Sequence, residues 1–191
     1  MHHLQAVNFM SKIEEAYRTI LNEVYPDWYK DENCKETPQR AEKAIIELTS
    51  GYKSDPGKLT TFSESKYNQI IAVKGIRYFS LCAHHLLPFF GDINIAIIPN
   101  GSVLGLSKYA RVALHYAKRL QIQERMTEEI AEHINESIKP KGVAVLITGT
   151  HLCMAMRGVQ SQNVVTETSA LRGCFMDEES ARAEVFKIFK G

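Results

Sequence analysis

The chain has 191 residues, of which 45% are hydrophobic and 24% are charged, with 23 basic residues against 22 acidic ones. This length suits one domain with a helical extension, and the composition excludes wholesale disorder. The formal net charge of +1 gives no electrostatic argument for nucleic acid or an anionic membrane, so neither is expected as a partner.

The lengths of the apolar runs and the spacing of the cysteines predict where in the cell the protein is located. No apolar run reaches the roughly 20 residues that span a bilayer, and the N-terminus lacks the pattern of a signal peptide. The four cysteines are widely spaced, unlike the dense arrangement of a disulfide framework. We therefore expect a soluble, cytoplasmic protein whose thiols are reduced.

Residues 1–66 are expected to form an N-terminal helical region that ends in a loop. Apolar side chains recur at intervals of three and four over residues 5–24, which predicts an amphipathic helix. Thr37 and Pro38 predict the start of a second helix, with Thr37 as its N-cap and its end near Gly51. The segment that follows is rich in Gly, Pro, Ser and Lys, which is typical of a loop.

Residues 67–191 are expected to form the main domain, of α+β class. The pattern predicts, in chain order, strands near 69–82 and 91–99, two helices within 107–138, strands near 142–156 and 164–175, and a short C-terminal helix. The break between the central helices is expected near 121–126, with Thr127 as the N-cap of the second. Strands in consecutive pairs favour an antiparallel sheet with both helices on one face. Its uncovered face and edges predict a homo-oligomer.

Two short segments carry side chains that bind metals. Cys82 and His85 are close enough in sequence for a thiolate and a neutral imidazole to chelate one zinc ion. His151 and Cys153 are two apart in a β-rich run, so both side chains are expected on one face of a strand. With His84, these side chains suit a catalytic zinc site with an open water position and spare histidines for proton transfer. The residues alone leave open whether His151 and Cys153 are instead ordinary core residues.

Two further groups can recognise a nucleotide. A hydroxyl and basic side chains near a helix N-terminus and after the second metal segment form a natural phosphate cradle, comprising Ser107, Lys108, Arg111 and Arg157. The amide and carboxylate of Gln123 and Glu124 can bind a guanine-like edge. Read in isolation, both groups are more often explained as solvated helix surface. His115 and His133, away from these motifs, are expected at the surface.

The motifs together resemble those of the GTP cyclohydrolase I family. The strings SLCAHHLLPFFG, VLGLSKYARV, RLQIQERMTEEIA, PKGVAV and THLCMAMRGVQ stand in that family's order and spacing, and TPQRAEKAIIELTSGY resembles its N-terminal helix. The resemblance covers nearly the whole chain from about residue 37. It implies the tunnelling fold, in which antiparallel sheets join around a ring. It also implies active sites between subunits, usually of a toroidal decamer made of two pentamers.

The resemblance also implies a role for each motif residue. The zinc ligands are Cys82, His85 and Cys153, and the proton-transfer histidines are His84 and His151. The guanine edge is held by Gln123 and Glu124, and the ribose and triphosphate are surrounded by Ser107, Lys108, Arg111 and Arg157. Ser107 is also a candidate catalytic hydroxyl in the ribose steps, and Lys58 is a further candidate phosphate contact.

The implied reaction is the zinc-dependent hydrolysis of GTP, the first step of folate and pterin biosynthesis. An activated water attacks C8 of the purine, and the imidazole ring opens to a formamide. A second hydrolysis releases formate, and rearrangement of the ribose closes a pterin ring, which gives 7,8-dihydroneopterin triphosphate.

The chain departs from the family pattern at several positions. Ala83 stands where members usually carry Glu, Gly75 where they carry Asp, and Arg77 where an acidic residue is common. Val164 and Val165 replace residues that are usually polar or basic. A carboxylate at position 83 could orient an imidazole and raise its basicity, which alanine cannot do. Two alternatives therefore stay open: a paralogue that stops at the ring-opened formamide or takes another nucleotide, and a slow or inactive zinc protein kept for nucleotide binding or assembly.

Overall fold

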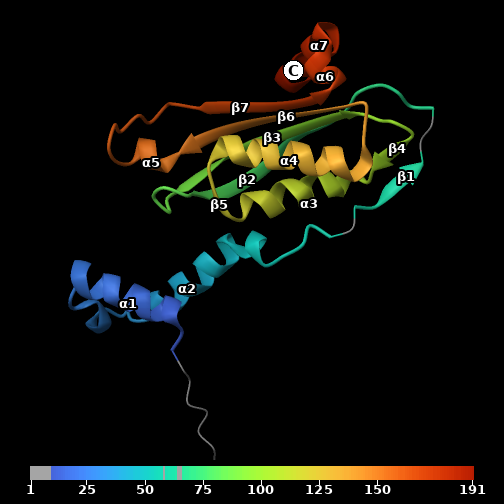
Figure 1. Ribbon diagram of the computed structural model, residues 1–191. Helices are drawn as coiled ribbons and strands as arrows, with labels where there is room; N and C mark the ends of the chain where they lie inside the picture. Colours follow the sequence, from blue (N-terminus) through green and yellow to red (C-terminus); the bar gives the residue numbers. More distant parts are fainter. Residues whose placement is uncertain (1–9, 58, 64–65) are drawn as a thin grey trace, which may run out of the picture. The chain divides into compact units, whose positions relative to one another are not determined.

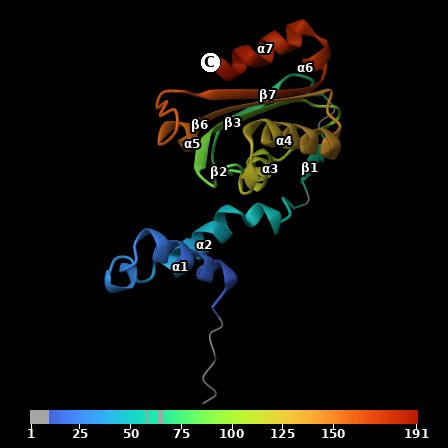
Figure 2. The ribbon, with the colours of Figure 1, turned by 60° about the vertical axis from the view of Figure 1, so that its left-hand side comes forward.

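The structure is a computed structural model that describes residues 10–57, 59–63 and 66–191. The chain divides into two compact units between Glu47 and Leu48. Lys58 lies outside the described residues, and so does the start of the helix expected from residue 5. Figures 1 and 2 show the ribbon from two directions. None of the helices in the described ranges combines the length and apolar character of a membrane span.

The first unit is helical, as predicted. It contains α1 (Lys12–Val24), the 3-10 helix η1 (Trp28–Lys30) and α2 (Thr37–Leu48). Ser11 caps α1, since its hydroxyl accepts a hydrogen bond from the backbone N–H of Glu14. Trp28 is buried, its indole N–H donates to the side chain of Asn22 at 2.8 Å, and the guanidinium of Arg18 lies 5.5 Å from its ring centre. One aromatic side chain therefore organises this unit.

The second unit has the expected order of strand pairs and helices, so the α+β class is confirmed. Its elements are η2 (Ser50–Tyr52), β1 (Thr61–Ser63), β2 (Ile71–Cys82), β3 (Pro88–Ile98), β4 (Ser102–Leu104), α3 (Leu106–Ala117), β5 (Leu120–Gln121), α4 (Gln123–Ile138), β6 (Gly142–His151), α5 (Leu152–Ala155), β7 (Thr166–Gly173), α6 (Cys174–Asp177) and α7 (Glu179–Lys190). The main sheet has the order β5-β2-β3-β6-β7, and β1 pairs with β4 separately. All neighbours in the main sheet are antiparallel except β5, which runs parallel to β2. The sheet is therefore mixed, not wholly antiparallel as predicted.

Helices pack against both faces of the main sheet. The pair α3 and α4 covers one face, as predicted, over a core that includes Tyr78, Phe89 and Ile93. The C-terminal segment forms two helices instead of one, and Figures 1 and 2 show them on the opposite side of the sheet. There Phe175 packs with Ala96 and other small strand residues, so the face expected to be bare is partly covered.

Two local predictions are wrong. The predicted strand at 142–156 ends at His151, and Cys153 lies in the short helix α5, so the two side chains do not share a strand face. The second central helix begins at Gln123, and Thr127 lies inside it. The Thr127 hydroxyl lies 2.7 Å from the carbonyl oxygen of Gln123 and 2.7 Å from the hydroxyl of Thr168 on β7. Its hydroxyl thus serves packing against the sheet instead of an N-cap.

Packing of the C-terminal helices is open to a direct stability test. Replacing the buried Phe175 by Ala should lower the free energy of unfolding by about 3–5 kcal/mol, because it removes a large side chain and leaves a cavity. The neighbouring Met176 is 52% exposed, and its replacement by Ala should cost less than about 1 kcal/mol. Urea unfolding measures both. Equal losses would show that α6 does not pack as described.

Candidate metal and nucleotide site

Two thiols and an imidazole converge at one end of the main sheet. The ligand atoms of Cys82, His85 and Cys153 all lie within 4.8 Å of one another. The turn after β2 places His85, since the backbone N–H groups of His85 and Leu86 both donate to the carbonyl of Cys82. The Sγ atom of Cys82 is 3.7 Å from Nδ1 of His85. Three such donors can hold a zinc ion and leave its fourth position open.

Strand register brings the distant Cys153 to this place. Within the antiparallel sheet, Phe89 on β3 pairs with Ser80 on one side and with His151 on the other. The end of β2 and the end of β6 therefore flank the start of β3 on the same edge of the sheet. Cys82 closes β2 and Cys153 follows β6 by two residues, so the register alone carries both thiols to one place.

The two remaining histidines lie beside the donors but in different surroundings. His84 is exposed, and its Nδ1 lies 3.8 Å from Sγ of Cys82. His151 is half-buried and stacks on the ring of Phe89, with centroids 4.6 Å apart and planes inclined by 6°. Burial lowers the pKa of His151, and the charge of Glu124 opposes this shift. His151 is thus biased toward the neutral imidazole that can accept a proton.

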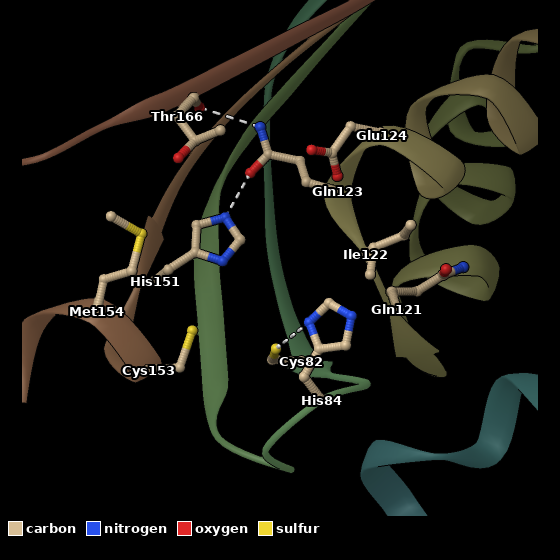
Figure 3. A pocket seen from close by; sticks show the side chains of 10 residues that line it. All are labelled: Cys82, His84, Gln121, Ile122, Gln123, Glu124, His151, Cys153, Met154 and Thr166. Carbon is tan, nitrogen blue, oxygen red and sulfur yellow. Dashed lines mark hydrogen bonds between the residues drawn. The ribbon is translucent and has the colours of Figure 1, made fainter. Parts of the chain in front are cut away.

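A cavity of about 240 Å³ adjoins the thiols (Figure 3). It is lined by Cys82, His84, Gln121, Ile122, Gln123, Glu124, His151, Cys153, Met154 and Thr166. The structure thus brings together the predicted catalytic histidines, both thiols and the predicted guanine pair. At 240 Å³ the cavity is smaller than the roughly 300–1,000 Å³ of typical ligand sites, so it suits part of a nucleotide.

Several lining residues were missed from the sequence. Gln121 and Ile122 precede α4, in the string already noted at the helix break, and the parallel pairing of Cys82 with Gln121 carries them to the cavity. Met154 lies in the helix that was expected to be a strand. Thr166 opens β7 and carries no local signal, because only the pairing of β6 with β7 places it there.

The residues that are expected to contact phosphate do not line this cavity. Ser107, Lys108 and Arg111 occupy the first turns of α3, while the other end of α3 leads to β5 and the cavity. With 12 residues, α3 is about 18 Å long. Ser107 and Arg111 instead line a second hollow of about 450 Å³. Arg157 is exposed just beyond α5. One chain therefore does not bring Ser107, Lys108 and Arg111 to the thiols.

The departures from the family pattern lie outside the cavity lining. Ala83 is exposed, and its backbone N–H donates to the carbonyl of Gln121 at 2.9 Å. Gly75 has a φ of 69° at an irregularity in β2, and its N–H donates to the side chain of Asn94 at 2.9 Å. Glycine suits that left-handed backbone. Arg77 forms an exposed ion pair with Asp92.

His115 is buried, so its predicted place at the surface is wrong. Only 9% of the residue is exposed, and its Nδ1 lies 3.2 Å from the hydroxyl of Ser54. Its Nε2 lies 2.5 Å from a guanidinium nitrogen of Arg119. Burial lowers the pKa of His115, the charges of Arg119 and His133 add to the shift, and Asp55 and Glu129 oppose it.

The sequence comparisons with known proteins agree on one family. The sequence model described as GTP cyclohydrolase I matches residues 13–190. A protein of Chlorobium phaeovibrioides named GTP cyclohydrolase 1 is 43% identical over 95% of this chain and 82% of its own length. The protein of the same name from Campylobacter curvus is 45% identical over 92% of this chain and 93% of its own. A solved apo structure of the archaeosine synthase QueF-Like gives a TM-score of 0.47 at 20% identity, over 59% of this chain and 97% of that one.

Metal binding should depend on the thiols that converge. We expect Cys82→Ser and Cys153→Ser each to lower the zinc affinity at least about tenfold, because a soft thiolate ligand is lost. Cys34→Ser, in the first unit, should bind zinc as the wild type does. Zinc content after dialysis against a competing chelator provides the measurement. Retention of zinc by both site variants would contradict the donor set.

The free energy of unfolding should decrease as the pH is lowered, in part because of His115. A folded pKa below the ordinary 6.5 means that the unfolded chain binds more protons below about pH 6.5, so the stability present above that value is lost as the pH falls. His115→Gln should flatten the dependence of the urea midpoint between about pH 7 and pH 5. If the variant and the wild type lose stability in parallel, His115 does not carry this dependence.

Proposed function

The chain belongs to the GTP cyclohydrolase I family, and we propose that it hydrolyses GTP to 7,8-dihydroneopterin triphosphate and formate. The observation that carries the proposal is the convergence of Cys82, His85 and Cys153 beside a cavity that also holds two further histidines. The reaction needs an activated water and groups that move protons to and from the opening purine ring. The donor set and the spare imidazoles have that chemistry.

The proposed cofactor is zinc, held by Cys82, His85 and Cys153. Burial raises the pKa of the Cys153 thiol, and the neighbouring Cys82 adds to the shift. A divalent cation offsets both effects, because it stabilises thiolates at short range. When bound with three protein ligands, zinc lowers the pKa of a water molecule toward neutrality.

The base of GTP is proposed to enter the cavity. Glu124 lines it with an exposed carboxylate, which can accept hydrogen bonds from the ring N–H and the exocyclic amine of guanine. His151, stacked on Phe89, and His84, beside Cys82, can take up and release protons. The proposed roles of Ser107, Lys108, Arg111 and Arg157 are contacts to ribose and triphosphate.

A second copy of the chain is proposed to complete the site. The cavity is small, and Ser107, Lys108 and Arg111 lie in the first half of α3, while the other end of that helix leads to the cavity within one chain. Large apolar side chains are exposed on several elements, including Phe79 at 56%, Leu106 at 67% and Val159 at 75%. In the described part of the chain, no strand pairs with the outer edge of β7. These features support contact with further subunits. The proposed assembly is the one that the family resemblance implies: a ring of subunits in the tunnelling fold, with residues 67–191 as its catalytic domain and two pentamers in the assembly.

A cytoplasmic location is part of the proposal. All four cysteines are free, and the proposed metal centre requires two of them as thiolates. A reducing compartment keeps such thiols available.

The activity is tested with zinc-loaded protein and GTP, by following formate release and the fluorescence of oxidised neopterin. We expect equal amounts of both products, and at least about a hundredfold loss of both in Cys153→Ser, since the activated water is lost. Formate without pterin would favour the paralogue with truncated chemistry. Binding of GTP without either product, and without a ring-opened formamide by mass spectrometry, would favour the impaired binding protein and overturn the proposal.

A further inference from the structure

The side-chain amide of Gln123 donates both of its hydrogen bonds to groups inside the protein. Gln123 is 1% exposed, and its Nε2 donates to the carbonyl oxygens of Ile147 at 3.1 Å and Thr166 at 3.0 Å. The hydroxyl of Thr168 lies 3.1 Å from the same nitrogen. An amide nitrogen has two hydrogens to donate, and carbonyl oxygens can only accept. Both hydrogens are therefore committed, and the network fixes which end of the amide is the nitrogen.

The other end of this amide dictates where His151 carries its proton. The Oε1 atom of Gln123 lies 2.9 Å from Nε2 of His151, a contact drawn in Figure 3. Because an amide oxygen can only accept, the hydrogen must sit on Nε2 of the imidazole. The neutral ring then has its lone pair on Nδ1. Stacking on Phe89 holds the plane of the ring, so both its tautomer and its orientation are set.

The surroundings of Gln123 are built for this contact. A Cβ atom at Gly149 would lie 2.3 Å from Oε1 of Gln123, so only glycine at that strand position leaves room for the amide. Gln123 itself opens α4, and its partners come from β6 and β7. The hydroxyls of Thr127 and Thr168 pair at 2.7 Å and join helix to strand beside it. Three elements thus hold one amide in one pose.

We propose that Gln123 is a positioning residue that fixes His151 as the Nε2–H tautomer, and that its side chain does not bind the guanine edge. This inference rests on the proposed function and replaces the role that the family resemblance implies for Gln123. Recognition of the base by a side chain at the start of α4 then falls to Glu124, which is exposed and lines the cavity. The two adjacent residues thus do different work: Gln123 acts on the chemical step and Glu124 on binding.

The two roles predict changes in different kinetic constants from substitutions at neighbouring residues. In the zinc-loaded protein, Gln123→Met keeps the length of the side chain but offers His151 only a weak thioether acceptor, so kcat should fall about a hundredfold with KM for GTP changed less than about threefold. Glu124→Gln, the matched control, should raise KM at least about tenfold, because a carboxylate acceptor is lost. Gly149→Ala, which displaces the amide without removing it, should act in the same direction as Gln123→Met.

A spectroscopic readout keeps the test independent of catalysis. Magic-angle-spinning NMR of zinc-loaded protein labelled with ¹⁵N-histidine, assigned with His151→Asn, should show Nε2 protonated and Nδ1 bare in the wild type and in Glu124→Gln. Gln123→Met should show the other tautomer or a mixture. The proposal is overturned if wild-type His151 carries its proton on Nδ1, or if Gln123→Met raises KM and leaves kcat unchanged. If the wild type releases no formate but shows the Nε2–H tautomer, the proposed function fails and the positioning role stands.

Discussion

The antiparallel register of β2, β3 and β6 is the constraint on which the site depends. It sets Ser80, Phe89 and His151 side by side, so Cys82 at the end of β2 and Cys153 in the helix that follows β6 meet although 70 residues separate them in the chain. The side-chain period of a strand is two, so a slip of one residue would turn His151 to the other face. A continuous core of apolar side chains beneath α3 and α4 holds this register.

The second organising principle is that buried polar groups must be paired. Gln123 is nearly inaccessible, and an unpaired amide there would cost on the order of 1–3 kcal/mol. The fold meets this need with acceptors from β6 and β7 on the nitrogen and with His151 on the oxygen. A requirement of stability therefore also determines the protonation of an imidazole in the site. Neither Ala83 nor Gly75 belongs to this network or to the residues that line the cavity, so the side chains that form the site are all present without the carboxylates usual at these positions.

The sequence predicted what local patterns control. Apolar periodicity placed the strand pairs and the helices, and the resemblance of the motifs pointed to the Cys82, His85 and Cys153 group. Local patterns gave wrong predictions where contacts with other parts of the fold set the place or role of a side chain. Thr127 looked like an N-cap, but its hydroxyl pairs with Thr168 on β7. The composition around Cys153 is typical of a strand, but Cys153 lies in a short helix. His115 is buried and contacts Ser54 and Arg119. The position of the Gln123 amide depends on the glycine at position 149. The contacts of Thr127 and Gln123 form only when the sheet is assembled.

The central claim is a metal centre with two thiolates, one imidazole and one open position. X-ray absorption at the zinc edge of the loaded protein measures that coordination shell directly. The account predicts two sulfur neighbours at about 2.3 Å and two nitrogen or oxygen neighbours at about 2.0–2.1 Å, one of them from solvent. Cys82→Ser should leave one sulfur in the shell. A shell with fewer than two sulfurs in the wild type, or one unchanged by Cys82→Ser, would contradict the account.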